Sequence, residues 1–396
     1  MIRILTAGES HGEALIGIVE GLPAGVSVTH GAIDEHLARR WLGFGRGGRA
    51  KFERDRIHIY SGVRFSRTMG SPVALRLDNA AYEKDRSGWP DVMAVEGSGE
   101  GVEAVTLPRP GHADLAGLQK YGFDDVRPVI ERASARETAM RVACCTLARL
   151  LLRELGIEVG SHVTQIGSIG YTGDEHRRRR DDLLQAGGEA LNRFADGSEV
   201  RMIDQSVGEA AIAHIREAKE RGDSLGGGYE VVATGVPAGL GSYVHWDRRL
   251  DGQLAQAIIS IQGQKAVEIG DGFASSWIPG SEFHDPIIAR DGGYPRATNH
   301  AGGLEGGVSN GMPIVVRGYM KPIPTLIKPL QTVDVGTGVA QPTRYERSDV
   351  TSVPAASTVA EAVVALVLAN AIVDRFGGDT VDGIRAAMES DGTSTS

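Results

Sequence analysis

The chain is poor in cysteine and in aromatic residues, and the shortage of cysteine excludes a class of protein. Its two cysteines, Cys144 and Cys145, are adjacent, so they cannot form an ordinary disulfide and lack metal-ligand spacing. A disulfide-stapled secreted framework is excluded, and we expect both thiols to be core residues in a reducing compartment. Aromatic residues make up only 5% of the chain, whereas 54 of its 396 residues are glycine. So much glycine favours loops that approach a ligand closely.

Neither a basic excess nor a long apolar run stands out. The formal net charge of -9 argues against a general nucleic-acid or membrane binder, since those proteins use a dominant basic surface. We find no apolar run close to the roughly 20 residues that span a bilayer, and no N-terminal secretion signal. The sequence therefore predicts a cytoplasmic protein with no membrane span and no nucleic-acid partner.

What is present is typical of a folded protein of mixed secondary structure. The hydrophobic fraction of 41% and the charged fraction of 23% are those of globular chains. Strand-like and helical segments alternate without a fixed period, and no Pro- or Ser-rich linker divides them. We therefore interpret residues 1–390 as one α/β or α+β domain, followed by a short polar tail at 391–396.

Two segments carry the strongest helical patterns. Residues 131–156 place apolar side chains on one face, and Ser-Ala-Arg-Glu at 134–137 predicts a capping box at the start. Residues 359–376 follow a similar box at 358–361 and stop at two glycines. Residues 79–110 are polar and without periodicity, which predicts a long irregular loop of the kind that is often functional.

Arginine is concentrated beside glycine, proline and the predicted capping residues. Guanidinium groups bind carboxylate and phosphate bidentately, so converging arginines would suit a small polyanion. Separate arginines would be ordinary solvated side chains, and an Arg-Gly loop with aromatics would also suit single-stranded RNA. The basic run at 176–180 has turn-like neighbours, and we interpret it as a solvated loop. The arginines of interest are Arg39, Arg40, Arg46, Arg49, Arg109, Arg132, Arg136 and Arg347.

Two of the eleven histidines directly adjoin glycine, His11 in GESHGE and His112 in PRPGHADL. Histidine is the natural proton carrier near neutral pH, although a structural histidine bonded to the backbone fits the same pattern. Neither histidine has metal-ligand spacing, so we predict no metal. The glycine-rich stretch 301–313, with Lys321 and Thr325 after it, can hold a phosphate, but taken alone it favours a structural turn.

Several segments together resemble chorismate synthase. GESHGEALIGIVEGLP at 8–23, ERASARETAMRVACCTL at 131–147 and RSDVTSVPAASTVAEAVVALVLANA at 347–371 are similar to the signature regions of that family, in the same order. LGFGRGGR at 42–49, PRPGHADL, QKAVEIGDGF and the 301–325 stretch also resemble it. The likeness runs from residue 1 to about residue 378.

The resemblance implies an α+β fold, a single-domain β-α-β-α sandwich that assembles as a homotetramer. It implies a carbon–oxygen lyase of the shikimate pathway, which leads to the aromatic amino acids. The reaction would convert 5-enolpyruvylshikimate 3-phosphate to chorismate by anti-1,4-elimination of phosphate, with reduced FMN as cofactor. NADPH bound to the chain, or a separate flavin reductase, would supply the reducing equivalents. The alternative is a non-catalytic relative that binds RNA or a phosphate ligand.

The resemblance also implies roles for individual residues. His11 would protonate or stabilise the reduced flavin, His112 would act near the departing phosphate or the substrate, and Asp349 would assist deprotonation. Arg40, Arg46, Arg49, Arg109 and Arg136 are expected to bind substrate or NADP, with Arg40 and Arg46 at the NADP positions. Flavin contacts carry over to Arg132, Ala133, Ser134, Gln262, Gly263, Gly306, Lys321, Pro322, Ile323, Pro324, Thr325 and Arg347.

The sequence around two of these flavin positions, Ser134 and Gly263, bears on how a flavin would bind. A capped helix start at Ser134 would offer N–H groups and a favourable dipole to an anion. Gly263-Gln264 departs from the family, which commonly has alanine followed by a small or apolar residue. The departure concerns the local packing of the flavin rather than the reaction.

Overall fold

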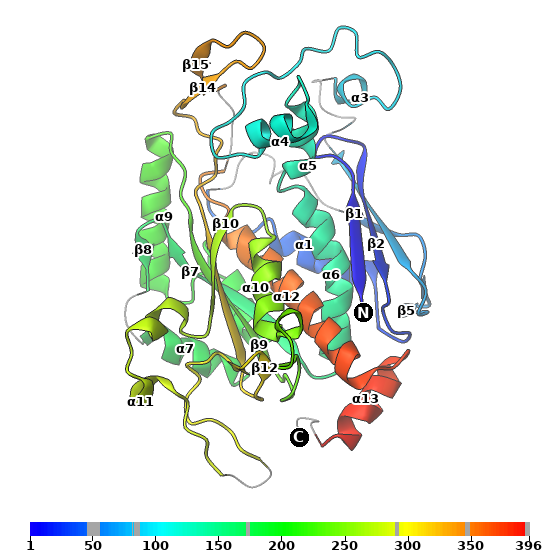
Figure 1. The fold of residues 1–396 in the computed structure, drawn as a ribbon, viewed down its shortest axis with the longest axis vertical. Coiled ribbons are helices and arrows are strands. Elements are labelled where there is room, and N and C mark those ends of the chain that lie inside the picture. The colour runs from blue at the N-terminus through cyan, green and yellow to red at the C-terminus, as the bar shows by residue number, and fades with distance from the viewer. Residues whose placement is uncertain are drawn as a thin grey trace.

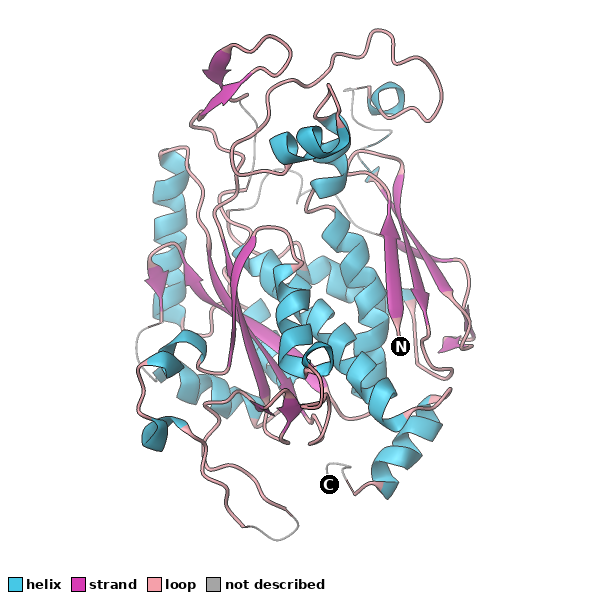
Figure 2. Ribbon diagram, viewed as in Figure 1, coloured by secondary structure: helices cyan, strands magenta, loops and turns pink. Residues whose placement is uncertain are grey.

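The computed structural model describes residues 1–45, 56–80, 82, 88–171, 175–289, 293–344 and 349–392, and within them sheets and helices alternate in layers (Figures 1 and 2). A four-stranded antiparallel sheet forms one outer layer, and a five-stranded antiparallel sheet lies across the central helices from it. Further helices cover the far face of the larger sheet. The expected α+β fold is confirmed.

The strands of the two sheets follow no simple chain order. The smaller sheet has the order β1-β2-β6-β3, from β1 (Arg3–Ala7), β2 (Ala14–Glu20), β6 (Val73–Asp78) and β3 (Ile57–Ile59). The larger has the order β10-β13-β9-β7-β8, from β10 (Gln264–Ile269), β13 (Ile314–Met320), β9 (Gly227–Thr234), β7 (Glu158–Ile166) and β8 (Ile169–Gly170). Short two-stranded pieces pair β4 (Val63–Arg64) with β5 (Arg67–Thr68), β11 (Leu304–Glu305) with β12 (Val308–Ser309), and β14 (Gln331–Val333) with β15 (Ala340–Pro342).

Helices fill the space between the sheets and cover the larger one. The central helices are α1 (His30–Arg39), α6 (Glu137–Glu154), α10 (Leu250–Ile259) and α12 (Val353–Phe376). Beyond the larger sheet lie α7 (Glu175–Leu184), α8 (Gly188–Asp196) and α9 (Gln205–Glu220). The remaining helices are α3 (Trp89–Val92), α4 (Asp114–Tyr121), α5 (Arg127–Ala133), α11 (Gly280–Phe283), α13 (Val381–Ser390) and two 3-10 turns at Trp246–Arg248 and Gly272–Ser276.

Helix α12 corrects our expectation that no segment is apolar enough to cross a membrane. It has 24 residues, and its 18-residue window reaches a mean hydropathy of 2.0. However, 78% of that window is buried inside the protein, where α12 packs on α6 and on β7 and β9. A helix that is apolar all round and enclosed by sheet and helices has the character of a core helix.

Both predicted capping boxes are wrong. The helix expected over 131–156 is two helices, because Ser134 is extended (φ -62°, ψ 142°) between α5 and α6. Helix α12 begins at Val353 rather than near residue 359, with proline in its first turn, and the Thr358 hydroxyl donates to the Ala355 carbonyl inside it. The glutamates of both boxes are engaged elsewhere, so neither reaches back to its expected cap.

The predicted solvated loop at 176–180 is also wrong. These residues belong to α7, and Arg180 is buried, donating to Glu230 at 2.9 Å. Glu230 lies on β9 with no exposed surface and accepts from Arg317 of β13 as well. A run of four arginines is therefore not uniformly solvated, because one of them compensates a carboxylate that the sheet buries.

A second buried ion cluster joins the central helices to the larger sheet. Glu361 of α12 has no exposed surface and contacts Arg39 of α1 at 2.7 Å, Arg201 at 3.2 Å and Arg149 of α6. The Ser161 hydroxyl of β7 donates to the same carboxylate. Burial alone would raise the pKa of Glu361, but Arg39 and Arg149 outweigh it and hold that pKa well below its usual range.

The same arginines make His36 of α1 a source of pH dependence. Burial, and then the charges of Arg149 and Arg39, lower the pKa of His36 to about 3. The unfolded chain would protonate this residue near pH 6.5, whereas the folded protein keeps it neutral. The free energy of unfolding is therefore unaffected by His36 above about pH 6.5 and decreases as pH falls from there toward 3, because only the unfolded chain takes up the proton.

We therefore expect His36→Gln to lose less stability than the wild type between pH 7 and pH 5, by at most about 1.4 kcal/mol per pH unit. Urea unfolding of both proteins at each pH measures the difference. Parallel pH profiles would show that His36 titrates normally in the folded protein.

The N-terminus of the chain is bonded to helix α12. The Ile2 amide donates to the Asn370 side chain at 2.6 Å, and the Asn370 amide group donates to the Ile2 carbonyl at 3.0 Å. Strand β1 is thereby fastened to the C-terminal part of α12.

Candidate active site

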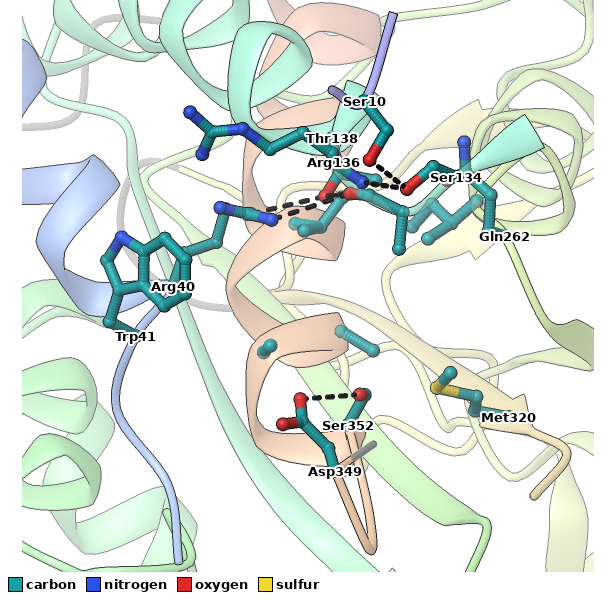
Figure 3. A pocket seen from close by; sticks show the side chains of 15 residues that line it. Ser10, Arg40, Trp41, Ser134, Arg136, Thr138, Gln262, Met320, Asp349 and Ser352 are labelled. Carbon is teal, nitrogen blue, oxygen red and sulfur yellow. Dashed lines mark hydrogen bonds between the residues drawn. The ribbon is translucent and has the colours of Figure 1, made fainter. Parts of the chain in front are cut away.

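A cavity of about 220 Å³ lies where the break between α5 and α6 meets the first turns of α12 (Figure 3). The segments around it come from both ends and the middle of the chain, and they supply cationic, hydroxyl and apolar groups. The lining residues are Ser10, Arg40, Trp41, Ser134, Ala135, Arg136, Thr138, Ile261, Gln262, Met320, Asp349, Ser352, Ala355, Ala356 and Val359.

The positive charge of the cavity comes from Arg40 and Arg136. Arg40 is buried at the end of α1, and it donates to the Thr138 hydroxyl at 3.2 Å and to the Ala135 carbonyl at 3.4 Å. Arg136 is the residue immediately before α6. Two guanidinium groups beside the same cavity favour an anionic ligand, as the sequence predicted for converging arginines.

Serine hydroxyls connect the break between α5 and α6 to the N-terminal loop. The Ser134 hydroxyl donates to the Ser10 hydroxyl at 3.0 Å and accepts from the Arg136 amide at 3.2 Å (Figure 3). Ser10 immediately precedes His11, so this contact fixes the position of the histidine loop relative to the cavity.

The expected anion site at a capped helix start is not formed at Ser134. The first amides of α6, at Glu137, Thr138 and Ala139, donate to the carbonyls of residues 134, 135 and 136. Those N–H groups are therefore used by the backbone and are not directed at the cavity. Side chains are therefore the groups through which this cavity can bind an anion.

The cavity combines an apolar wall with a buried polar atom that lacks a partner. Ile261, Met320 and Val359 offer apolar surface. Gln262 adds a polar side chain to this wall. Its side-chain nitrogen donates to Glu137 at 3.1 Å, whereas its buried oxygen has no hydrogen-bond partner among the described residues. An unpaired buried acceptor beside an apolar wall is a feature that a ligand N–H would satisfy.

Asp349, in the segment that leads into α12, also lines the cavity. It is partly buried and accepts from the Ser352 hydroxyl at 3.5 Å, just before α12 begins (Figure 3). The predicted site residues Arg46, Arg49 and Arg347 lie outside the described residues. The structure thus brings Arg40, Ser134, Arg136, Gln262 and Asp349 of the predicted set together around one cavity.

His11 lies beside the cavity, next to Ser10. Its ring nitrogen Nδ1 is 2.9 Å from Oε1 of Glu131, a residue of α5 that is only 3% exposed. The ring stacks on Trp89 at 3.9 Å between centroids and 12° between planes. Trp89 belongs to the predicted irregular loop, which thereby covers His11.

His112 has a carboxylate partner of its own. Asp114, at the start of α4, has no exposed surface and pairs with Nδ1 of His112. Arg109 donates to the same carboxylate from its backbone at 2.9 Å and from Nε at 2.8 Å. Burial would raise the pKa of Asp114, but the bonds from His112 and Arg109 outweigh it and hold that pKa well below its usual range.

The predicted phosphate-holding segment 321–325 packs against the His112 loop. Lys321, directly after cavity-lining Met320, donates from Nζ to the Gly111 carbonyl. Burial and the charge of Lys265 lower the pKa of Lys321. Pro322, Ile323, Pro324 and Thr325 continue this segment, and the Ile323 carbonyl accepts from Ser224 at 2.7 Å. The end of β13 therefore connects the cavity to His112.

Four of the predicted flavin positions are not among the described residues that line the cavity. Arg132 donates to the backbone carbonyls of Thr6 and Gly8, so it ties α5 to the end of β1, and Ala133 ends that helix. Gly263 has φ +81°, and a Cβ there would lie 3.1 Å from Met320. Gly306 is in the turn between β11 and β12 and is not one of the described residues that line the cavity.

Sequence reasoning missed several residues that hold this site. Asp114 lies two residues after His112 in the quoted motif, so its proximity was a usable signal. Glu131 and Trp89 are 120 and 78 positions from His11, and no local sequence pattern predicts either contact. No group of three or more potential metal-ligating side chains is present in the described part of the chain.

Comparisons with known proteins agree over nearly the whole chain. The family model described as chorismate synthase matches residues 2–373. A chorismate synthase of Salinibacter ruber is 64% identical over 398 residues, covering 99% of this chain and 98% of the relative. One of Chlorobaculum tepidum is 52% identical over 391 residues, covering 98% and 97%. A crystal structure of chorismate synthase superposes with a TM-score of 0.78 at 39% identity, covering 99% and 97%.

Proposed function

This chain belongs to the chorismate synthase family, and we propose that it forms chorismate from 5-enolpyruvylshikimate 3-phosphate by anti-1,4-elimination of phosphate. Family membership makes it a carbon–oxygen lyase of the shikimate pathway, acting on a small molecule in aromatic amino-acid biosynthesis with a reduced flavin. The observation that carries the proposal is a cavity with two arginines, an apolar wall and two carboxylate-bound histidines in the loops beside it.

Arginines would bind and orient the substrate, which carries two carboxylates and a phosphate. Arg40 and Arg136 line the cavity, and Arg109 lies beside His112. Their convergence would neutralise the anions and hold the ring in one orientation, which lowers the entropic part of the barrier. Arg46 and Arg49, which follow α1 in sequence, are proposed to complete this set.

The two histidines and Asp349 would handle protons. We assign His11 to the flavin side, His112 to the departing phosphate and Asp349 to the removal of the substrate hydrogen. General acid–base groups of this kind each contribute roughly 10²- to 10⁴-fold to a rate. The buried carboxylates on Nδ1 of both histidines suit the assignment, because they orient the rings for transfer through the other nitrogen.

We propose FMN as the flavin. Ser134, Gln262 and Gly263 would hold it at the cavity wall, Lys321 to Thr325 would lie near its phosphate, and Arg347 would add a charge. Arg132, Ala133 and Gly306 complete the proposed contacts. When bound, reduced FMN supplies electron density to the substrate without net oxidation.

We further propose a cytoplasmic homotetramer in which residues 1–390 form a single domain and 391–396 a tail. The reducing equivalents would come from NADPH bound near Arg40 and Arg46, or from a separate flavin reductase.

An anaerobic assay tests the proposed reaction. Enzyme, chemically reduced FMN and 5-enolpyruvylshikimate 3-phosphate are mixed, and chorismate and phosphate are followed beside an oxidised-FMN control. We expect equal amounts of both products, only with reduced flavin and with no net flavin consumption. Oxidised FMN with NADPH in a further arm tests flavin reduction by the chain itself. No product from folded, flavin-loaded protein would instead favour a relative that only binds a phosphate ligand.

A further inference from the structure

One carboxylate holds His11 at two points. Oε2 of Glu131 accepts from the His11 backbone amide at 2.7 Å, and Oε1 lies 2.9 Å from Nδ1 of the ring. The side chain of Glu131 is only 1% exposed. Because both oxygens contact the same residue, the carboxylate fixes the imidazole relative to its own backbone as well as in space.

Other residues around His11 also restrict its position. The Ser10 amide donates to the Glu131 carbonyl at 3.2 Å, and the Asn79 amide group donates to the carbonyls of Ser10 and Gly12 at 2.9 and 3.0 Å. Trp89 covers one face of the ring, with the Arg127 guanidinium 5.8 Å from the centre of the indole. The loop is thus held on both sides of the histidine, and rotation of the ring is blocked by a stacked aromatic.

A carboxylate at Nδ1 selects one tautomer of a neutral imidazole. Ionised glutamate only accepts hydrogen bonds, so the Nδ1 that faces it must carry a proton. The second nitrogen, Nε2, is then the one that takes up or releases a proton during a reaction. This relation between a buried carboxylate and a catalytic histidine is a general means of setting ring orientation and tautomer.

We propose that Glu131 is a positioning residue, which holds His11 in the Nδ1–H tautomer so that Nε2 carries out proton transfer. This inference rests on the proposed function, in which His11 acts on the flavin side. Within the described part of the chain, the Glu131 side chain forms hydrogen bonds to His11 alone, so it would act through that residue.

Glutamine at this position should reverse the tautomer. The His11 amide requires an acceptor, so the amide oxygen of Glu131→Gln would remain at 2.7 Å from it and place the NH₂ group against Nδ1. Nδ1 would then have to accept, and the proton would move to Nε2. Shape and volume are almost unchanged, so packing against Trp89 should survive.

The test combines kinetics with a direct observation of the ring. For Glu131→Gln in the anaerobic assay we expect kcat to fall by about 10²-fold or more, with KM changed by less than about threefold. ¹⁵N NMR of histidine-labelled protein, with the His11 signals assigned by their loss in His11→Ala, should show the proton on Nε2 rather than Nδ1. Glu131→Asp keeps an acceptor-only group and should retain the Nδ1–H tautomer and more of the turnover than Glu131→Gln.

A matched control is Glu158→Gln on β7, whose carboxylate accepts a backbone N–H from Glu189 at 3.0 Å and forms no hydrogen bond to a histidine among the described residues. It should leave kcat and the His11 signals unchanged. The proposal is overturned by wild-type kcat in Glu131→Gln, by a loss confined to KM, or by an unaltered tautomer. If Glu131→Gln fails to fold, loss of the Nδ1–H tautomer in folded Glu131→Asp overturns it. Failure of the wild type to form chorismate would refute the proposed function. The NMR measurement would still show whether Glu131 sets the tautomer of His11.

Discussion

Replacement of Glu361 by glutamine is expected to reduce the free energy of unfolding by about 3–5 kcal/mol. The carboxylate lies without exposed surface among Arg39, Arg149 and Arg201. A neutral amide would leave those cations without their shared counter-charge, in a region where water cannot solvate them. A loss of this size is a large share of the stability of an ordinary domain.

Urea unfolding at fixed protein concentration measures this loss, since any assembly would make stability depend on concentration. Glu20→Gln is the matched control, because Glu20 pairs with Arg3 at 3.0 Å in solvent. An exposed pair of that kind is worth about 0–1 kcal/mol. Equal losses in the two variants would contradict a special contribution from the buried cluster.

Replacement of His11 by alanine is expected to lower turnover by about 10²- to 10⁴-fold while leaving flavin affinity nearly unchanged. His11 is absent from the described lining of the cavity, so its removal takes away little contact surface there. What it removes is a ring held by Glu131 and Trp89 in one orientation. Such a group contributes mainly when a proton moves in the transition state.

Anaerobic steady-state kinetics and a titration of reduced FMN separate the two effects. His58→Ala is a suitable control, because His58 is an exposed residue of β3 that forms a surface pair with Asp78 at 2.9 Å. It should behave as the wild type. Normal turnover in His11→Ala would remove this histidine from the mechanism, whereas a loss of flavin affinity alone would make it a binding residue.

The sequence predicted the mixed architecture and the arginines beside the cavity, but not the polar contacts that hold them. Periodicity located α6 because its apolar face is long, and α12 was located by its long apolar run with glycines at the end. It could not show that Ser134 bonds to Ser10, more than a hundred positions away, instead of capping a helix. Arg180 was misjudged for the same reason, since its partner Glu230 lies on a strand fifty positions later. Long-range electrostatic pairing leaves no periodic trace along a chain.

The cavity joins residues from the two extremes of the chain, Ser10 near the start and Val359 near the end. On the ribosome, its wall is therefore incomplete until the start of α12 has emerged, and the Ile2–Asn370 pairing that fastens the N-terminus to α12 forms later still. A nascent chain cannot complete this cavity while it is being made, so a ligand that binds there enters after synthesis. Contacts this distant in sequence also close slowly, which makes assembly of this cavity a late event in folding.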